Sequence, residues 1–177
     1  MVGAVAVRLP RSVVERLERE AQKLGLSLEE YVLELVLKGL DPAERIREYV
    51  EAAQDLLDQA REELGKGDVR QAAEKAWGAA ALAVKAYAMW REGRRLTSHR
   101  ELWVYSKKMM DELGEWVYDS WMAATGMHVC FYEGWCTRRH VEEALKRIQK
   151  LVEKVEEKLK SLSCWPAVPS TGPGING

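Results

Sequence analysis

Apolar residues recur every three or four positions along most of the chain, the spacing of helices that bury one face. Three such stripes, over 46–64, 69–87 and 141–159, predict the longest helices. The stretch 102–121 continues the pattern, with Gly114 placed to divide it into two helices. The pattern therefore predicts an antiparallel bundle of four or five helices.

Capping residues indicate where these helices begin and end. Starts are predicted by Ser-x-x-Glu boxes at 12–15, 27–30 and 98–101, by Asp41-Pro42, and by Asp68 and Thr137; stops are predicted at Gly25, Gly39, Gly65, Gly93 and Gly114. Within these bounds, the run "WGAAALAVKAYA" is dense in small residues, which lets a helix approach its neighbours closely. We expect that helix to lie at the centre of the bundle.

The two ends of the chain follow different patterns. The stretch "AVAVRLP" at 4–10 alternates like a strand, and two short helical stripes follow it. We therefore expect an all-α fold with three parts: a strand-helix-helix appendage over 1–41 for dimerisation or packing, a bundle over 42–162, and a flexible Pro-, Gly- and Ser-rich tail over 163–177.

Composition narrows the class of protein. Hydrophobic residues make up 47% of the 177 residues, enough for one well-packed domain, and a net charge of −1 gives no global attraction to nucleic acid. There is no apolar run long enough for a membrane span and no signal-peptide pattern, so we expect a cytoplasmic protein. The single Asn beside 31% charged residues suggests a thermophilic source.

The N-terminal pattern over 7–40 resembles the ribbon-helix-helix fold, in which two chains pair their strands and read DNA. On the outward face of the predicted strand, only Arg8 could hydrogen-bond to a base. Residues 1–41 also carry six basic side chains against seven acidic ones. This balance favours packing or dimerisation, and a DNA-binding regulator remains an alternative.

The bundle resembles archaeal PaREP-type proteins, which belong to the HEPN class of helical domains. The resemblance is carried by the segments 62–88, "SHREL" at 98–102, "HVCFYEGW" at 128–135 and "VEEAL" at 141–145. It implies a HEPN-like up-and-down bundle that forms a homodimer. Such domains are either ribonuclease toxins, often paired with a nucleotidyltransferase-like partner protein, or noncatalytic modules that bind nucleotide or RNA.

The HEPN nuclease signature places an arginine shortly before a histidine, to stabilise phosphate charge while the histidine transfers a proton. The matching histidine is His128, but Trp121, Met122 and Ala123 stand where the arginine belongs. Arg94 precedes His99 at a similar spacing, although in a predicted loop. We therefore assign no catalytic residue and favour a noncatalytic module over a ribonuclease with a degenerate motif.

The window 128–140 gathers two histidines and two cysteines, which leaves three readings open. His128, Cys130, Cys136 and His140 contain ligand types that hold zinc. The two cysteines could equally form a disulfide or be buried as small apolar residues. We assign no metal and no cofactor.

The segment 90–108 interleaves arginines and lysines with aromatic residues, a combination that grips phosphate and stacks bases. We predict a nucleotide or RNA site built from this basic loop and from the junction before the last helix. The predicted ligand-binding residues are Arg94, Arg95, His99, Arg100, His128, Tyr132 and Glu133.

Overall fold

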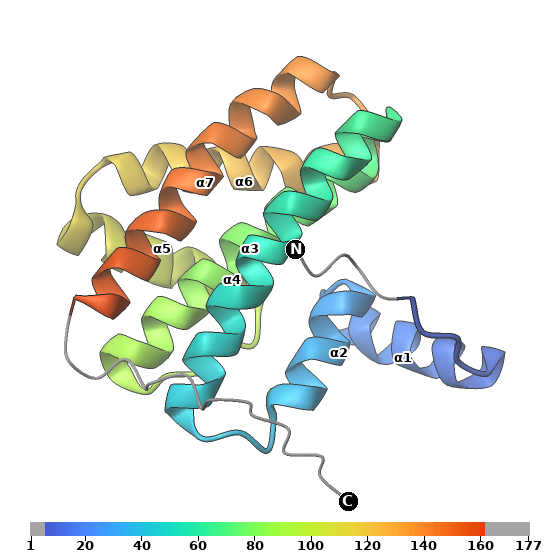
Figure 1. Ribbon diagram of the computed structural model, residues 1–177, viewed down its shortest axis with the longest axis horizontal. Helices are drawn as coiled ribbons and strands as arrows, with labels where there is room; N and C mark the ends of the chain where they lie inside the picture. The colour runs from blue at the N-terminus through green and yellow to red at the C-terminus, as the bar shows by residue number, and fades with distance from the viewer. Residues whose placement is uncertain (1–5, 162–177) are drawn as a thin grey trace, which may run out of the picture.

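A computed structural model describes residues 6–161, and all regular structure in that part is helical (Figure 1). The seven helices are α1 (Arg11–Leu24), α2 (Leu28–Leu37), α3 (Pro42–Lys66), α4 (Val69–Glu92), α5 (His99–Leu113), α6 (Trp116–Glu133) and α7 (Arg138–Lys160). The predicted tail over 163–177 lies outside the described residues. Between residues 6 and 161, no helix has both the length and the hydrophobicity that a membrane crossing demands.

The long helices α3 and α4 fold back on each other across a two-residue turn. Gly67 adopts a left-handed conformation with φ 86°, which few other residues take without strain. The carboxylate of Asp68 then accepts a hydrogen bond from the Gln71 N–H at 3.0 Å and caps α4. The predicted start at Asp68 is confirmed.

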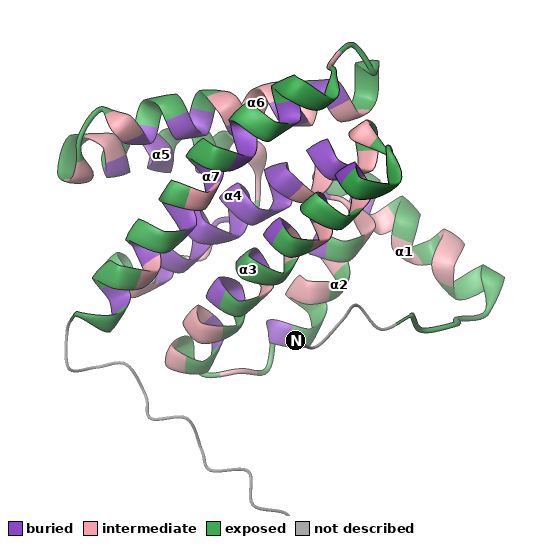
Figure 2. Ribbon diagram, turned by 45° about the horizontal axis from the view of Figure 1, so that its top comes forward, coloured by how far each residue is buried: buried purple, intermediate pink, exposed green. Residues whose placement is uncertain are grey.

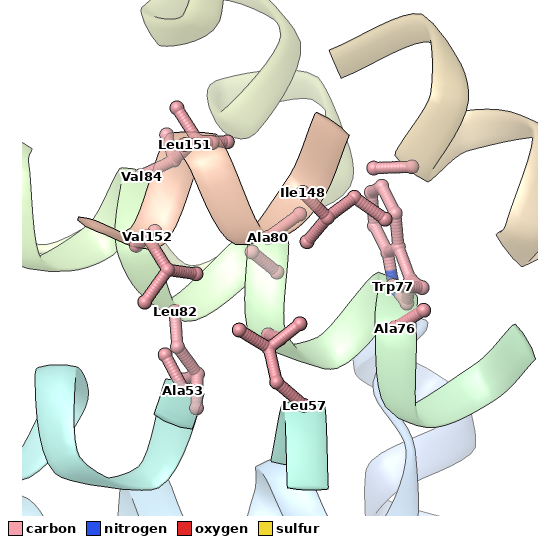
Figure 3. Close-up of a cluster of buried hydrophobic side chains, with 14 of the residues drawn as sticks. Ala53, Leu57, Ala76, Trp77, Ala80, Leu82, Val84, Ile148, Leu151 and Val152 are labelled. Atoms are coloured by element: carbon pink, nitrogen blue, oxygen red, sulfur yellow. The ribbon is translucent and has the colours of Figure 1, made fainter. Parts of the chain in front are cut away.

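Helix α4 is the centre of the bundle and is buried along most of its length (Figure 2). Its small side chains let α3 pack on one side and α7 on the other, as Figure 3 shows around Ala80. A Cβ atom on Gly78 would lie 3.0 Å from Leu56 Cδ1, so the contact between α3 and α4 depends on this glycine. The predicted central helix is confirmed.

Glycines also separate the last three helices. Gly114, with φ 109°, follows α5 and confirms the predicted break in the stretch 102–121. Gly134, with φ 68°, ends α6 and lets the chain turn toward α7. Residues far apart in the sequence are thereby brought against α4.

The predicted N-terminal strand is not supported where the chain is described. Residues 6–10 are irregular and exposed, and residues 4 and 5 lie outside the described part. A strand needs a neighbouring strand to satisfy its backbone hydrogen bonds, and residues 6–161 contain none. The predicted cap at Ser12 is also wrong, because α1 already begins at Arg11 after Pro10.

A buried polar network fastens α2 to the bundle. Lys85 Nζ on α4 and the Tyr49 hydroxyl on α3 each donate to Glu34 Oε1 at 2.9 Å, and Arg95 donates to Glu34 Oε2 at 3.1 Å. Lys85 is 2% exposed, so this charge depends on its partners rather than on water. Beyond α2, most of α1 is exposed on the outside of the molecule (Figure 2).

Candidate functional site

Two histidines from different helices meet on a buried tryptophan. The His99 ring, at the start of α5, lies 4.7 Å from the His128 ring on α6, measured between centroids. Both rings contact Trp77 of α4, at 5.4 Å and 4.7 Å. The capped start of α5 positions His99, where the Ser98 hydroxyl accepts from the Glu101 N–H at 3.3 Å. The structure thus joins two of the predicted residues.

This histidine pair lies in apolar surroundings. Burial, and secondarily the nearby His99, lower the pKa of His128 to about 4, so its ring is neutral near pH 7. His99 Nε2 and Trp77 Nε1 are buried and have no hydrogen-bond partner within residues 6–161. Tyr132 contacts His128 at 5.1 Å between centroids and is 61% exposed, so it forms the outer edge of the cluster.

Glu133 and Trp121 of α6 bring no charged group to this histidine pair. Glu133 is exposed and makes no hydrogen bond or ion pair within residues 6–161. Trp121 is 2% exposed and packs on Trp77 at 5.3 Å, so this position belongs to the core. No described arginine is hydrogen-bonded to His128.

Most of the predicted basic loop is neutralised by neighbouring carboxylates. Arg94 pairs with Glu101 at 3.4 Å, and Arg95 pairs with Glu34 at 3.1 Å in the buried network. The same holds for two more cations of the segment, which form the pairs Arg91–Glu112 and Lys108–Glu92. These groups are consequently less available to a phosphate than their sequence suggests.

Two cations of the segment 90–108 form no ion pair with a carboxylate in the described chain. Arg100 and Lys107 are exposed and have no ion-pair partner in the described chain. They lie on one face of α5 with Trp103, three and four residues away, which is 42% exposed. Lys107 and Trp103 line a groove of about 300 Å³ with Tyr118 of α6, which is 53% exposed.

The window 128–140 contains a disulfide rather than a metal site. Cys130 at the end of α6 is bonded to Cys136 in the loop that follows, with Cα atoms 5.5 Å apart. His140 instead accepts a hydrogen bond from the Thr137 N–H at 3.0 Å and helps to cap α7. No group of three potential metal ligands occurs anywhere in the described chain.

The junction before α7 exposes aromatic side chains. Gly134 ends α6 there, and Arg70 Nε donates to the Phe131 carbonyl at 2.8 Å. Trp135 is 49% exposed, and Tyr132 is exposed as well. Aromatic surface is therefore available beside the histidine pair.

Sequence reasoning also missed Lys107 and Tyr118 as a pair, because they lie on different helices. The usable signal was the spacing of Arg100, Trp103 and Lys107, which places all three on one helical face. Comparison of the whole chain with protein-family models gives a match over residues 48–152 to the archaeal PaREP1/PaREP8 family.

The chain belongs to the archaeal PaREP1/PaREP8 family. The match covers more than half of the chain and runs from within α3 to within α7. The PaREP1/PaREP8 region therefore includes the histidine pair and the groove between α5 and α6. No curated protein and no solved structure matches the chain.

Proposed function

We propose that this PaREP-family protein is a noncatalytic module that binds single-stranded RNA or a nucleotide in the groove between α5 and α6. The proposal rests on one face of α5, where Arg100 and Lys107 flank the exposed Trp103. Tyr118 offers a second aromatic surface across the groove. Aromatic rings stack bases of any sequence, while nearby cations attract the phosphates.

The noncatalytic part of the proposal rests on the histidine pair. His128 is neutral near pH 7 because its pKa is lowered to about 4, so it makes a poor general acid. The positions where the signature arginine would stand are occupied by Trp121, Met122 and Ala123, none of which carries a charge. A phosphoryl-transfer site without a charge stabiliser lacks the largest usual contribution to rate.

Binding is tested by fluorescence anisotropy with a labelled RNA of about twelve nucleotides, a typical length for a single-strand site. Trp103→Ala should weaken binding by about tenfold, the effect of losing one stacked base. Lys107→Ala should weaken binding and reduce the salt dependence of the affinity by about one phosphate contact. Circular dichroism checks that both variants stay folded.

Lys108→Ala is the matched control, because Lys108 adjoins Lys107 on α5 but is paired with Glu92. Its affinity should stay close to that of the wild type. Equal losses in Lys107→Ala and Lys108→Ala would show only a diffuse charge effect and contradict the groove. RNA cleavage that disappears in His128→Ala would refute the noncatalytic assignment.

We further propose a HEPN-like bundle that forms a homodimer through its N-terminal part. The support is an exposed apolar surface on residues 6–10, α1 and α2, made by Val7, Leu9, Val13, Val32 and Val36. Pairing of residues 6–10 with a second copy would supply the missing strand partner. Light scattering should give twice the 20.2 kDa chain mass, and Val7→Asp with Leu9→Asp should return the monomer.

A further inference from the structure

A cleft separate from the groove lies between α2, α3 and α4, with a volume of about 190 Å³. Its floor is apolar and is formed by Leu33, Leu56 and Leu82, one residue from each helix. Gly78 lies on the same floor, and its missing side chain keeps α4 close to Leu56. An elongated apolar group would be shielded from water on this floor.

The lining residues of this cleft carry an excess of negative charge. Glu29, Glu30, Asp55 and Glu74 all line it, together with one cation, Lys75. Lys75 is already paired with Glu29. The side chains of Glu74 and Asp55 form no hydrogen bond or ion pair among residues 6–161, so the four carboxyl groups of the lining outnumber its single cation.

Glu30 is the most deeply buried of these carboxylates, at 5% exposed. One of its oxygens, Oε2, accepts from the Ser27 N–H at 3.2 Å in the cap of α2. The other, Oε1, is buried without a hydrogen-bond partner, and its ion pair with Lys85 is long, at 4.0 Å. A buried carboxylate oxygen normally accepts a hydrogen bond, so Glu30 Oε1 lacks an expected donor.

The pKa of Glu74 also reflects the small number of cations in the cleft. Burial raises its pKa to about 7, with further increases from Glu29 and Glu30 that Lys75 only partly offsets. Burial, and after it the nearby carboxylates of Glu74 and Glu30, raise the pKa of Tyr132. The charged groups that face Glu74 are therefore mainly acidic.

From this arrangement we propose that the cleft binds an aliphatic di- or polyamine, with ammonium groups on the carboxylates and methylenes on the leucine floor. A bare metal ion fits poorly, because no three potential ligands converge within residues 6–161 and the floor is apolar. An alkyl-ammonium chain matches both features, since its stem is apolar and its charge is fixed near neutral pH.

Calorimetric titration of the whole protein with spermidine and with 1,4-diaminobutane tests this site. Both should bind, and 1,4-butanediol, which has the same stem without charge, should not. Glu74→Gln should weaken spermidine binding about tenfold, the loss of about one charged contact. Binding should also tighten between about pH 6 and pH 8, as Glu74 becomes ionised while the amine stays charged.

Asp111→Asn is the matched control, because Asp111 is an exposed carboxylate that does not line the cleft. Its affinity for spermidine should equal that of the wild type. Unchanged binding by Glu74→Gln, equal binding of the diol, or displacement of spermidine by Mg²⁺ at matched ionic strength would each overturn the proposal. Glu74→Gln removes a repelled charge and should stay folded, which urea unfolding checks.

The amine site and the RNA groove can be judged independently. Neither Trp103 nor Lys107 lines the acidic cleft, and Glu74 does not line the groove. We expect Glu74→Gln to retain RNA binding and Trp103→Ala to retain amine binding. Loss of both activities in either variant would point to a shared folding defect and overturn the assignment of two separate sites.

Discussion

Replacing Lys85 by Met tests the buried network that holds α2 against the bundle. The substitution keeps the length of the side chain and removes its charge. It leaves the Glu34 carboxylate, 13% exposed at the side chain, without its ammonium partner at 2.9 Å. We expect the free energy of unfolding to fall, because a buried charge without its partner is poorly solvated.

The size of this loss follows from what Glu34 retains. Breaking a buried ion pair from one side costs about 3–5 kcal/mol. Glu34 still accepts from Tyr49 at 2.9 Å and from Arg95 at 3.1 Å. We therefore expect a lower value, about 2–4 kcal/mol near pH 7.

The loss should depend on pH in a defined direction. Burial alone would raise the pKa of Glu34, but Lys85 and the hydrogen bonds hold it below its usual value of 4.5. A carboxyl with a lowered pKa contributes stability above its usual pKa and loses that contribution as the pH falls through the lowered one. The difference between wild type and Lys85→Met should accordingly shrink in acid.

Urea unfolding followed by far-UV circular dichroism measures both effects. Lys66→Met is the control, because the Lys66–Glu63 pair lies on the surface, where solvent screens it, and its loss should change the stability far less than the loss of Lys85. A cycle of Lys85→Met with Glu34→Gln should give a coupling energy above about 1 kcal/mol. A loss below about 1 kcal/mol in Lys85→Met, or additive single effects, would refute the proposed role of the network.

Three further predictions concern other parts of the molecule. Glu74→Gln should stabilise the ligand-free protein at pH 8 and leave its stability unchanged at pH 4, because the raised pKa of Glu74 costs stability as the pH rises toward 7. Since the Glu74 side chain is only half-buried and partly screened by water, we expect a gain of no more than about 1–2 kcal/mol, and urea unfolding at both pH values gives its sign. NMR titration should show that the His128 ring stays neutral until the pH falls to about 4. The wild type should lose stability as the pH falls from 6.5 to about 4, and His128→Phe should reduce that loss. Replacing Cys130 and Cys136 by Ser should lower the free energy of unfolding by about 2 kcal/mol, as expected for so short a loop, and thiol titration checks the pairing.

Most boundaries of α3, α4, α5 and α7 could be predicted because their signals are local. The predicted stop at Gly65 is wrong, because α3 continues to Lys66 and ends at Gly67, which takes the left-handed conformation. Asp41 and Asp68 accept from backbone N–H groups within three residues, and Gly93 ends α4 in a left-handed conformation. The break at Gly114 is of the same kind. Such capping contacts depend on neighbours in the sequence and therefore need no knowledge of the tertiary fold.

The candidate sites depend on contacts that no local pattern contains. Lys85 and Glu34 are 51 residues apart, so the sequence could show only a lysine inside an apolar helix. The sequence suggested that the charge of Arg95 is available to a ligand, but in the fold α2 places Glu34 beside it. The wrong prediction of a strand has a related cause, since a strand needs a partner for its hydrogen bonds and residues 6–161 contain no other strand.

The tight turn between α3 and α4 also has a consequence for the order of folding. The two-residue turn lets the ends of α3 and α4 next to it meet through residues close in the sequence, so the first contacts of the hairpin form with little loop-closure entropy. We expect it to be structured in the transition state. Substitutions at its interface, such as Leu57→Ala, should then slow folding, whereas those that loosen α2 should mainly speed unfolding.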